Sequence, residues 1–337
     1  MPDPLARLTE DERSRLRRVS LPATSSAMLA TLTEDRFSDP DWIFERKLDG
    51  VRCLARRDRR GRVQLHSRND KDMSGTYPEI AEALSAAVGS AGTDLVVDGE
   101  VVAFEGRRTS FERLQGRLGL TDPDEARATG IAVFYYVFDI LHLDGHDVRR
   151  LPNLTRKRVL RDALTFDDPL RYVTHRRTAG EEAFRAACER GDEGVIAKRS
   201  AAPYTGGRSK DWLKFKCVRD QELVVGGWTN PRGSRSGFGA LLVGYYDSDT
   251  LVYAGKVGTG FDGRLLHAVK DELDRLAADD SPFGRGRVTG KDVHWVRPEL
   301  VAQIAFTEWT RDGRLRHPRF QGLRTDKAAR DVVREQR

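Results

Sequence analysis

The chain has 337 residues, which corresponds to about two domains, and 39% of them are hydrophobic, enough to build cores. Lys and Arg outnumber Asp and Glu by 58 to 52, and a net charge of +6 is too modest to establish a polyanionic partner. No apolar run reaches the roughly 18 to 20 residues of a membrane helix, and the N-terminus is too charged for a signal peptide. We therefore expect neither membrane spanning nor secretion. The three cysteines (Cys53, Cys188 and Cys217) lack CxxC spacing, which argues against a disulfide scaffold and a zinc site.

The first domain is predicted to mix strands and helices without regular alternation. Residues 1–21 are expected to form a charged N-terminal arm, and the domain itself to span 22–219. Strands are predicted at 42–47, 51–57, 63–68, 94–104, 132–141 and 194–199, and helices at 78–88, 154–164 and 179–191. This pattern favours an α+β fold with antiparallel sheets over a doubly wound parallel sheet.

The second domain is predicted to be mostly β. Strands are expected within 222–229, 239–247, 251–261 and 301–310, with one helix at 264–277 and hairpin turns at 143–145 in the first domain and 247–249 in the second. Short strands with a single helix suit a small all-β barrel such as an OB-fold. We place this domain at 220–327 and a C-terminal tail at 328–337.

The segment 45–52, Glu-Arg-Lys-Leu-Asp-Gly-Val-Arg, holds a candidate nucleophile in Lys47. Taken alone, a lysine before an Asp-Gly turn is typical of an ordinary hairpin. As a nucleophile, a lysine with an ordinary pKa of about 10.4 needs a pocket or neighbouring cations that lower its pKa. An amine that attacks also needs an electrophile whose charge is neutralised, which points to phosphorus with a metal and basic residues around it.

Other segments supply acidic and basic partners for this chemistry. Glu100 lies in the apolar run 94–104, and Glu193 leads into the apolar strand 194–199; two such carboxylates could hold Mg²⁺, although each is also typical of a satisfied turn acid. Lys214 and Lys216 alternate with apolar residues, so both lie on one strand face, which is either solvated or aimed at a phosphate.

The order of these segments settles the interpretation. The chain resembles the covalent nucleotidyltransferases, and specifically the ATP-dependent DNA ligases, over about residues 22–327. The segments that carry the resemblance are, in chain order, KLDGVR (47–52), HSRN (66–69), DGE (98–100), VFDIL (137–141), EGVIAKR (193–199), WLKFK (212–216) and RFQGLRTDK (319–327). KxDG alone is weak evidence, but seven segments in order are strong, and the wording is most similar to bacterial end-joining ligases.

The resemblance implies a role for each matching residue. Lys47 would attack the α-phosphate of ATP and form lysyl-AMP, Glu45 would accept a hydrogen bond from the adenine amino group, and Phe138 would stack on the base. The remaining residues would contact the sugar, the phosphates, the metal or the nick: Asp49, Arg52 and Arg68 at the ribose or the DNA break, Glu100 and Glu193 at the sugar and the metal, Lys214 and Lys216 at the α-phosphate, and Arg324, Asp326 and Lys327 at the pyrophosphate.

The implied function is ATP-dependent sealing of nicked or broken duplex DNA in repair or end joining, with Mg²⁺ or Mn²⁺ as the metal. The resemblance further implies a cytoplasmic, nucleoid-associated monomer that does not bind membranes and has an end-binding or end-joining protein as a partner. Two alternatives remain. An RNA ligase or an mRNA-capping guanylyltransferase shares KxDG, and a non-catalytic end-bridging protein shares the fold.

Two further sets of residues are predicted to lie outside this chemistry or at its edge. The stretch 229–240, with Arg232 and Arg235, is either a contact surface for the phosphate backbone or a solvated loop. His142, His146 and His175 show no metal-binding spacing and are predicted to be turn or surface residues.

Overall fold

The computed structural model describes residues 3–23, 25–88, 92–217, 220–231, 237–289, 292–310 and 312–335, apart from the side chain of Arg264. The chain divides into two compact units, Met1–Cys217 and Val218–Gln336. Among the described residues, no helix has the length and apolar character needed to cross a membrane.

Two sheets form the first unit. The larger has eight strands, in the order β1-β9-β8-β6-β4-β5 with β10 added to β8 and β7 to β6; the smaller has five, in the order β11-β3-β12-β13-β2. The strands of the larger sheet are β1 (Arg17–Arg18), β4 (Val51–Arg57), β5 (Val63–Ser67), β6 (Leu95–Glu105), β7 (Arg108–Thr109), β8 (Val133–Leu143), β9 (His146–Asp147) and β10 (Leu170–Tyr172). Those of the smaller sheet are β2 (Met28–Leu32), β3 (Trp42–Lys47), β11 (His175–Arg177), β12 (Gly194–Arg199) and β13 (Gly207–Lys216).

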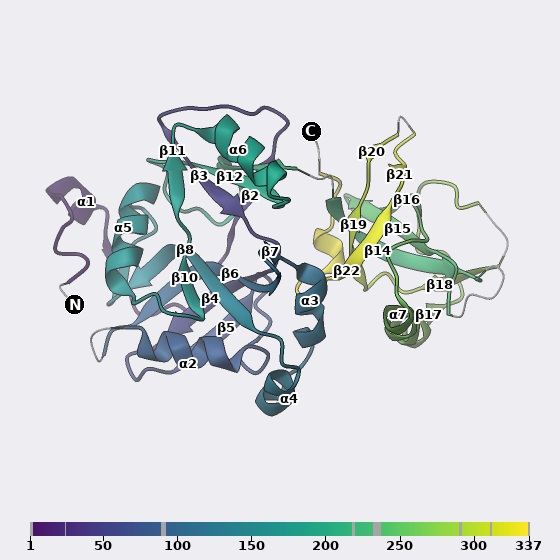
Figure 1. The fold of residues 1–337 in the computed structure, drawn as a ribbon, viewed down its shortest axis with the longest axis horizontal. Helices are drawn as coiled ribbons and strands as arrows, with labels where there is room; N and C mark the ends of the chain where they lie inside the picture. Colours follow the sequence, from purple (N-terminus) through teal and green to yellow (C-terminus); the bar gives the residue numbers. More distant parts are fainter. Residues whose placement is uncertain are drawn as a thin grey trace. The chain divides into compact units, whose positions relative to one another are not determined.

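Helices cover the outer faces of these two sheets, and the sheets face each other (Figure 1). The helices of this unit are α1 (Glu10–Ser14), α2 (Pro78–Ala86), α3 (Phe111–Leu114), the 3-10 turn η1 (Gln115–Arg117), α4 (Pro123–Ala128), α5 (Asn153–Ala163) and α6 (Gly180–Glu189). One core joins α2 and α5 to the larger sheet, and another joins α6 to the smaller sheet. A third core, which includes Leu54, Phe138 and Trp212, fills the space between the sheets.

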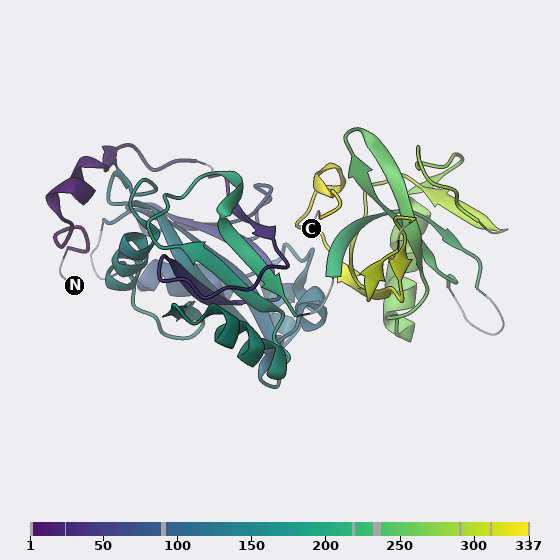
Figure 2. The ribbon, with the colours of Figure 1, turned by 90° about the horizontal axis from the view of Figure 1, so that it is seen from above.

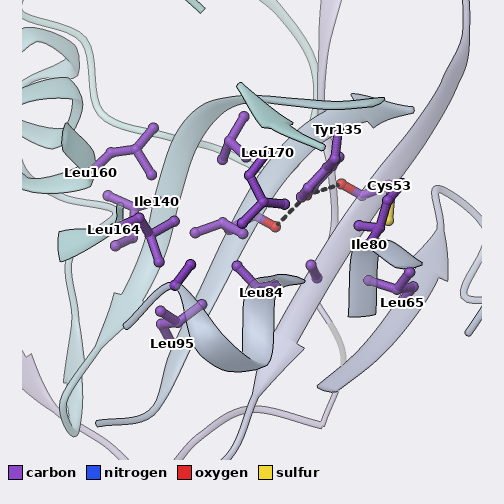
Figure 3. Close-up of a cluster of buried hydrophobic side chains, with 14 of the residues drawn as sticks. Cys53, Leu65, Ile80, Leu84, Leu95, Tyr135, Ile140, Leu160, Leu164 and Leu170 are labelled. Carbon is purple, nitrogen blue, oxygen red and sulfur yellow. Dashed lines mark hydrogen bonds between the residues drawn. The ribbon is translucent and has the colours of Figure 1, made fainter. Parts of the chain in front are cut away.

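Strand alternation produces this layering. In β4, Val51, Cys53 and Ala55 enter the core under α2 and α5, while Leu54 points to the other sheet. The hydroxyl of Tyr135 donates to the carbonyl oxygen of Cys53 at 2.8 Å, so the buried tyrosine leaves no polar atom unsatisfied in the apolar core (Figure 3). The free thiol Cys53 therefore serves as a small core residue, as predicted.

The N-terminal arm packs on the first unit. Leu5 and Leu8 are buried in the core under α5, and the Glu12 carboxylate accepts hydrogen bonds from Thr155 and Arg158 of that helix. The predicted choice between a short helix and a frayed arm thus resolves as α1 held against α5.

The second unit is an antiparallel sheet of seven strands covered by one helix (Figures 1 and 2). Its strands are β14 (Asp220–Thr229), β15 (Leu241–Asp247), β16 (Thr250–Val257), β17 (Ala277–Ala278), β18 (Val293–Val296), β19 (Val301–Ala305) and β22 (Arg319–Leu323), with the separate ribbon β20 (Glu308–Trp309) and β21 (Leu315–Arg316). Helix α7 (Gly263–Arg275) starts at Asp262, whose side chain caps the Leu265 amide, and its apolar stripe enters the core of the sheet. The 3-10 turn η2 (Ala329–Asp331) precedes Val332, which is buried against β14 to β16.

The structure contains one disulfide, between Cys188 and Cys217, which the sequence analysis did not expect. The two residues are 29 positions apart, so their spacing carries no signal. They meet because α6 packs under β12 and β13 pairs with β12, which brings the end of α6 to the end of β13.

We predict that reducing this disulfide destabilises the first unit. Opening a loop of 29 residues restores freedom to the unfolded chain and lowers the free energy of unfolding by about 2–4 kcal/mol. Denaturant unfolding with and without dithiothreitol measures the change. Cys188→Ser serves as the control, since reductant should have no further effect on it; identical curves for the wild type in both conditions would refute the prediction.

Candidate active site

The smaller sheet aligns the predicted site residues in cross-strand rows. Residues directly opposite each other in an antiparallel sheet point to the same face. The rows across β3, β12 and β13 are Lys47–Gly194–Lys216, Glu45–Ile196–Lys214 and Ile43–Lys198–Trp212. All of them lie on the face turned to the larger sheet, because Trp212 enters the core between the two sheets. Three lysines and a glutamate predicted from separate segments thus share one surface.

Gly194 is required at the centre of the first row. Its φ of +146° lies outside the range that side chains favour, and an added Cβ would come within 1.9 Å of the carbonyl oxygen of Phe215. The glycine lets β12 approach β13 closely and places no side chain between Lys47 and Lys216.

Lys47 forms an ion pair with Glu193, the residue that precedes β12. The backbone of Glu193 is fixed, because its carbonyl oxygen accepts from the Cys217 amide at 3.0 Å. The neighbouring Asp192 is buried and binds Arg46 at 2.8 Å. These contacts hold the carboxylate of Glu193 beside the candidate nucleophile.

Glu45 is buried between two lysines. Its Oε1 lies 2.5 Å from Lys157 Nζ and its Oε2 lies 2.7 Å from Lys198 Nζ. Burial acts to raise the pKa of Glu45, but the two ammonium groups outweigh burial and lower it, so the carboxylate is ionised. The sequence analysis predicted Glu45 as an acceptor for the adenine amino group but did not predict that two lysines bind it.

The larger sheet presents Arg52 toward the same space. Arg52 binds Asp98 through two hydrogen bonds of 2.5 Å, and the Tyr204 hydroxyl donates to the same carboxylate at 2.6 Å. Burial acts to lower the pKa of Arg52, but Asp98 raises it well above its ordinary value. Asp98 is the acidic residue of the apolar strand that needs a partner, and Arg52 satisfies it.

Phe138 lies where the two sheets meet. A register shift between Asp98 and Gly99 of β6 leaves Phe138 without an opposite residue, and its ring enters the core between the sheets. Lys198 Nζ lies 4.3 Å and Arg52 Cζ 4.6 Å from the ring centroid, so two cations contact this aromatic ring.

Asp49, Arg68 and Glu100 occupy the rim of this space. Asp49 accepts from the Phe111 amide at 3.3 Å, at the start of α3. Arg68 follows the last residue of β5 and lies in a turn, so the predicted strand 63–68 ends one residue early. Glu100 pairs in register with Arg52 and Tyr136, which places it on the same face as Arg52.

The predicted residues of the second unit pair among themselves. Arg324 binds Asp326 through two hydrogen bonds of 2.9 Å, and Lys327 Nζ lies 2.6 Å from Glu222. Burial acts to raise the pKa of Asp326, but Arg324 outweighs it and lowers the pKa. These three residues are described within their own unit. Arg232 and Arg235 of the predicted loop lie outside the described residues.

One histidine prediction is wrong. His142 is 1% exposed, because β8 continues to Leu143 and the ring packs beside Asp94 at 3.4 Å. Burial lowers its pKa despite that carboxylate. His175 is partly buried in β11, opposite Glu45, and is not a free surface residue either.

Sequence reasoning also missed Lys157, Lys198, Asp98 and Trp212 as parts of the site. Each lay in a quoted segment, but a lysine in an amphipathic helix such as α5 looks like a solvated residue. The one available signal was Asp98, an acid in an uninterrupted apolar strand.

The residues fit a magnesium ion only in part. Among the described residues, no group of three or more His, Cys, Asp and Glu side chains is arranged as a metal site. Within that part of the chain, however, Glu193 Oε2 is buried without a hydrogen-bond partner. An orphaned carboxylate oxygen is a suitable ligand for Mg²⁺, which commonly takes one or two protein carboxylates and completes its shell with substrate phosphates.

Comparison with known proteins identifies this arrangement. Residues 27–216 match the family model described as ATP dependent DNA ligase domain, and residues 234–327 match the ATP dependent DNA ligase C terminal region. The chain belongs to the ATP-dependent DNA ligase family. The α+β prediction is confirmed: a nucleotidyltransferase domain is followed by an OB-fold domain.

The relatives of this ligase chain include two larger bacterial proteins, each called a multifunctional non-homologous end joining protein LigD. The protein of Pseudomonas aeruginosa is 38% identical over 88% of the chain, and that of Mycolicibacterium smegmatis 37% over 93%. The chain spans only 35% and 40% of their lengths. A solved structure of mycobacterial DNA ligase D complexed with ATP and MES is similar with a TM-score of 0.64 at 34% identity, covering 92% of this chain and 98% of that one.

We predict that Asp98→Ala is strongly destabilising. The substitution leaves Arg52 buried without its counter-charge, which costs about 3–5 kcal/mol of the free energy of unfolding. Guanidinium denaturation of the two proteins measures the difference. As a control, Glu82→Ala removes an exposed ion pair with Arg127 and should cost less than about 1 kcal/mol; equal losses in the two variants would contradict the assignment.

Proposed function

We propose that this chain is a DNA ligase that uses ATP to seal 3′-hydroxyl and 5′-phosphate ends in duplex DNA, with Lys47 as the nucleophile. The observation that carries the proposal is the row Lys47–Gly194–Lys216, with Glu193 paired to Lys47 and Glu45 one row deeper. A nucleophile, a carboxylate and cations converge on one surface between two sheets, as transfer to phosphorus requires.

The proposed reaction has three steps. The Lys47 amine loses its proton and attacks the α-phosphorus of ATP; a P–N bond forms, the bond to pyrophosphate breaks and pyrophosphate leaves. A 5′-phosphate oxygen of the DNA then attacks the same phosphorus, so a P–O bond forms, the P–N bond breaks and the amine is released. Finally the 3′-hydroxyl attacks the DNA 5′-phosphate, a phosphodiester forms and AMP leaves.

Glu45 and Phe138 are proposed to bind the base. Glu45 is ionised and buried, so it is an acceptor suited to an adenine amino group. Stacking on Phe138 requires the base to share or displace the ring contacts with Lys198 and Arg52. Lys214 and Lys216 lie in the same rows as Glu45 and Lys47, which suits them to the α-phosphate.

Glu193, with Glu100, is proposed to hold Mg²⁺, or Mn²⁺ in its place. The support is the orphaned Oε2 of Glu193. When bound, the metal neutralises charge on the phosphates. Asp49, Arg52 and Arg68 are proposed to contact the ribose and the DNA break, and the pairs that Asp49 and Arg52 already make would orient them.

The second unit is proposed to supply Arg324, Asp326 and Lys327 to the pyrophosphate in the first step. We take the adenylation domain as 22–219 and the OB-fold domain as 220–327. The biological setting proposed is end joining in the cytoplasm with an end-binding protein as a partner, supported by the similarity to LigD proteins.

The first prediction of this proposal concerns covalent labelling. The pure protein, incubated with α-labelled ATP and Mg²⁺, should become labelled, and singly nicked DNA should remove the label as the nick closes. Lys47→Ala should show no label, because it lacks the attacking amine, while its circular dichroism spectrum remains that of the wild type. Label on Lys47→Ala would refute the nucleophile, and label that chases onto nicked RNA instead of DNA would favour an RNA ligase.

The second prediction separates the steps. Arg324→Ala should slow labelling by ATP about 100-fold or more, as expected when a cation on a reacting phosphate is lost, yet seal pre-adenylylated nicked DNA within about fivefold of the wild-type rate. Single-turnover assays of the two reactions measure the rates. Asp326→Asn, which weakens the hold on Arg324, should show the same pattern more mildly; equal losses in both reactions would contradict a role confined to pyrophosphate.

A further inference from the structure

Three charged groups are buried together at the base of the candidate active site. Glu45, Lys157 and Lys198 are exposed by 3%, 1% and 1%. One carboxylate and two ammonium groups leave this cluster with a surplus positive charge. Since unbalanced buried charge is costly, the arrangement calls for a reason other than stability.

The two lysines are engaged unequally. Lys157 Nζ donates to Glu45 at 2.5 Å and to the Val173 carbonyl oxygen at 2.9 Å, and it lies over the ring of Tyr172. Lys198 Nζ is near Glu45 but forms no well-aligned hydrogen bond among the described residues, and its other neighbours are the rings of Phe138 and Trp212. Lys157 is therefore the lysine that fixes the carboxylate.

The backbone that carries Lys157 is held rigidly. The adjacent residue of α5, Arg156, is fully buried, binds Asp139 of β8 at 2.7 and 3.0 Å and donates to the carbonyl oxygens of Leu151 and Ala202. Because α5 is anchored to β8 in this way, the Lys157 ammonium has a defined place relative to both sheets. A defined donor on Oε1 of Glu45 fixes the plane of that carboxylate.

We propose that Lys157 is a positioning residue for base selection: it orients Glu45 so that the carboxylate accepts from the 6-amino group of adenine. This inference rests on the proposed function and adds a residue to it. Without Lys157, Glu45 keeps Lys198 as its only cation, rotates toward it and loses its alignment with the base. Discrimination in favour of the amino group then falls, although the protein still folds and still reacts.

The test compares ATP with purine riboside 5′-triphosphate, which lacks the 6-amino group, in self-adenylylation of the full chain. A hydrogen bond to a charged acceptor predicts a wild-type preference for ATP of about 10- to 100-fold in kcat/KM. Lys157→Met should lower this preference about tenfold. The loss should appear in the KM for ATP, with the rate at saturating ATP within about threefold of wild type, because the contact to the base is made before and during the reaction alike.

Further variants separate positioning from general loosening. Lys157→Gln keeps an amide donor for the Val173 carbonyl and should reproduce the loss if Lys157→Met folds poorly, whereas Lys157→Arg should restore part of the preference. The matched control is Arg117→Met, which removes a buried ion pair with Glu79 on the other side of the larger sheet's core and should leave the preference unchanged. In a Glu45→Gln background, Lys157→Gln should have no further effect on the preference.

The outcomes are distinct. A wild-type preference retained in Lys157→Met and Lys157→Gln overturns the inference, as does an equal loss in Arg117→Met. Wild-type protein that reacts equally with both triphosphates also overturns it but leaves the ligase proposal intact. Wild-type protein that forms no covalent adduct with ATP overturns the proposed function itself, and the inference with it.

Discussion

The pairing of β12 between β3 and β13 is the constraint on which the site depends. The chain places Lys47, Glu193 and Lys216 in three segments far apart in sequence, and only the register of these strands brings them into one row. Gly194 makes the row possible, since any side chain there would collide with the backbone of β13. A slip of one residue would turn Lys47 and Lys216 to the opposite face, against α6.

The second feature is that the charges between the sheets are almost all held by partners. Asp98 binds Arg52 and Tyr204, and Glu45 binds two lysines. Such pairs add little to stability compared with apolar residues, but they fix the positions of polar groups in a space shielded from water. The site is therefore pre-organised by ion pairs that do not themselves react, and its cations surround the aromatic ring that is proposed to bind the base.

Much of the fold was accessible from periodicity. The six strands predicted in the first domain and its three helices occur within a few residues of the expected bounds, because long apolar or amphipathic runs leave little choice. The edge strands were missed: β2 and the first half of β13 are partly polar, and only pairing with a neighbour makes them strands. The Cys188–Cys217 disulfide was missed for a related reason, since it joins elements that only the sheet brings together.

The sequence by itself determined which residues carry the chemistry and the family to which the chain belongs, because short segments in a fixed order survive as a linear pattern. It also predicted that an acid in the apolar strand β6 must have a partner. Only the tertiary structure decided what that partner is, that Lys157 and Lys198 enclose Glu45, and that His142 is buried. These are facts about contacts between residues over 40 positions apart, and they depend on how sheets and helices pack, which no local sequence pattern encodes.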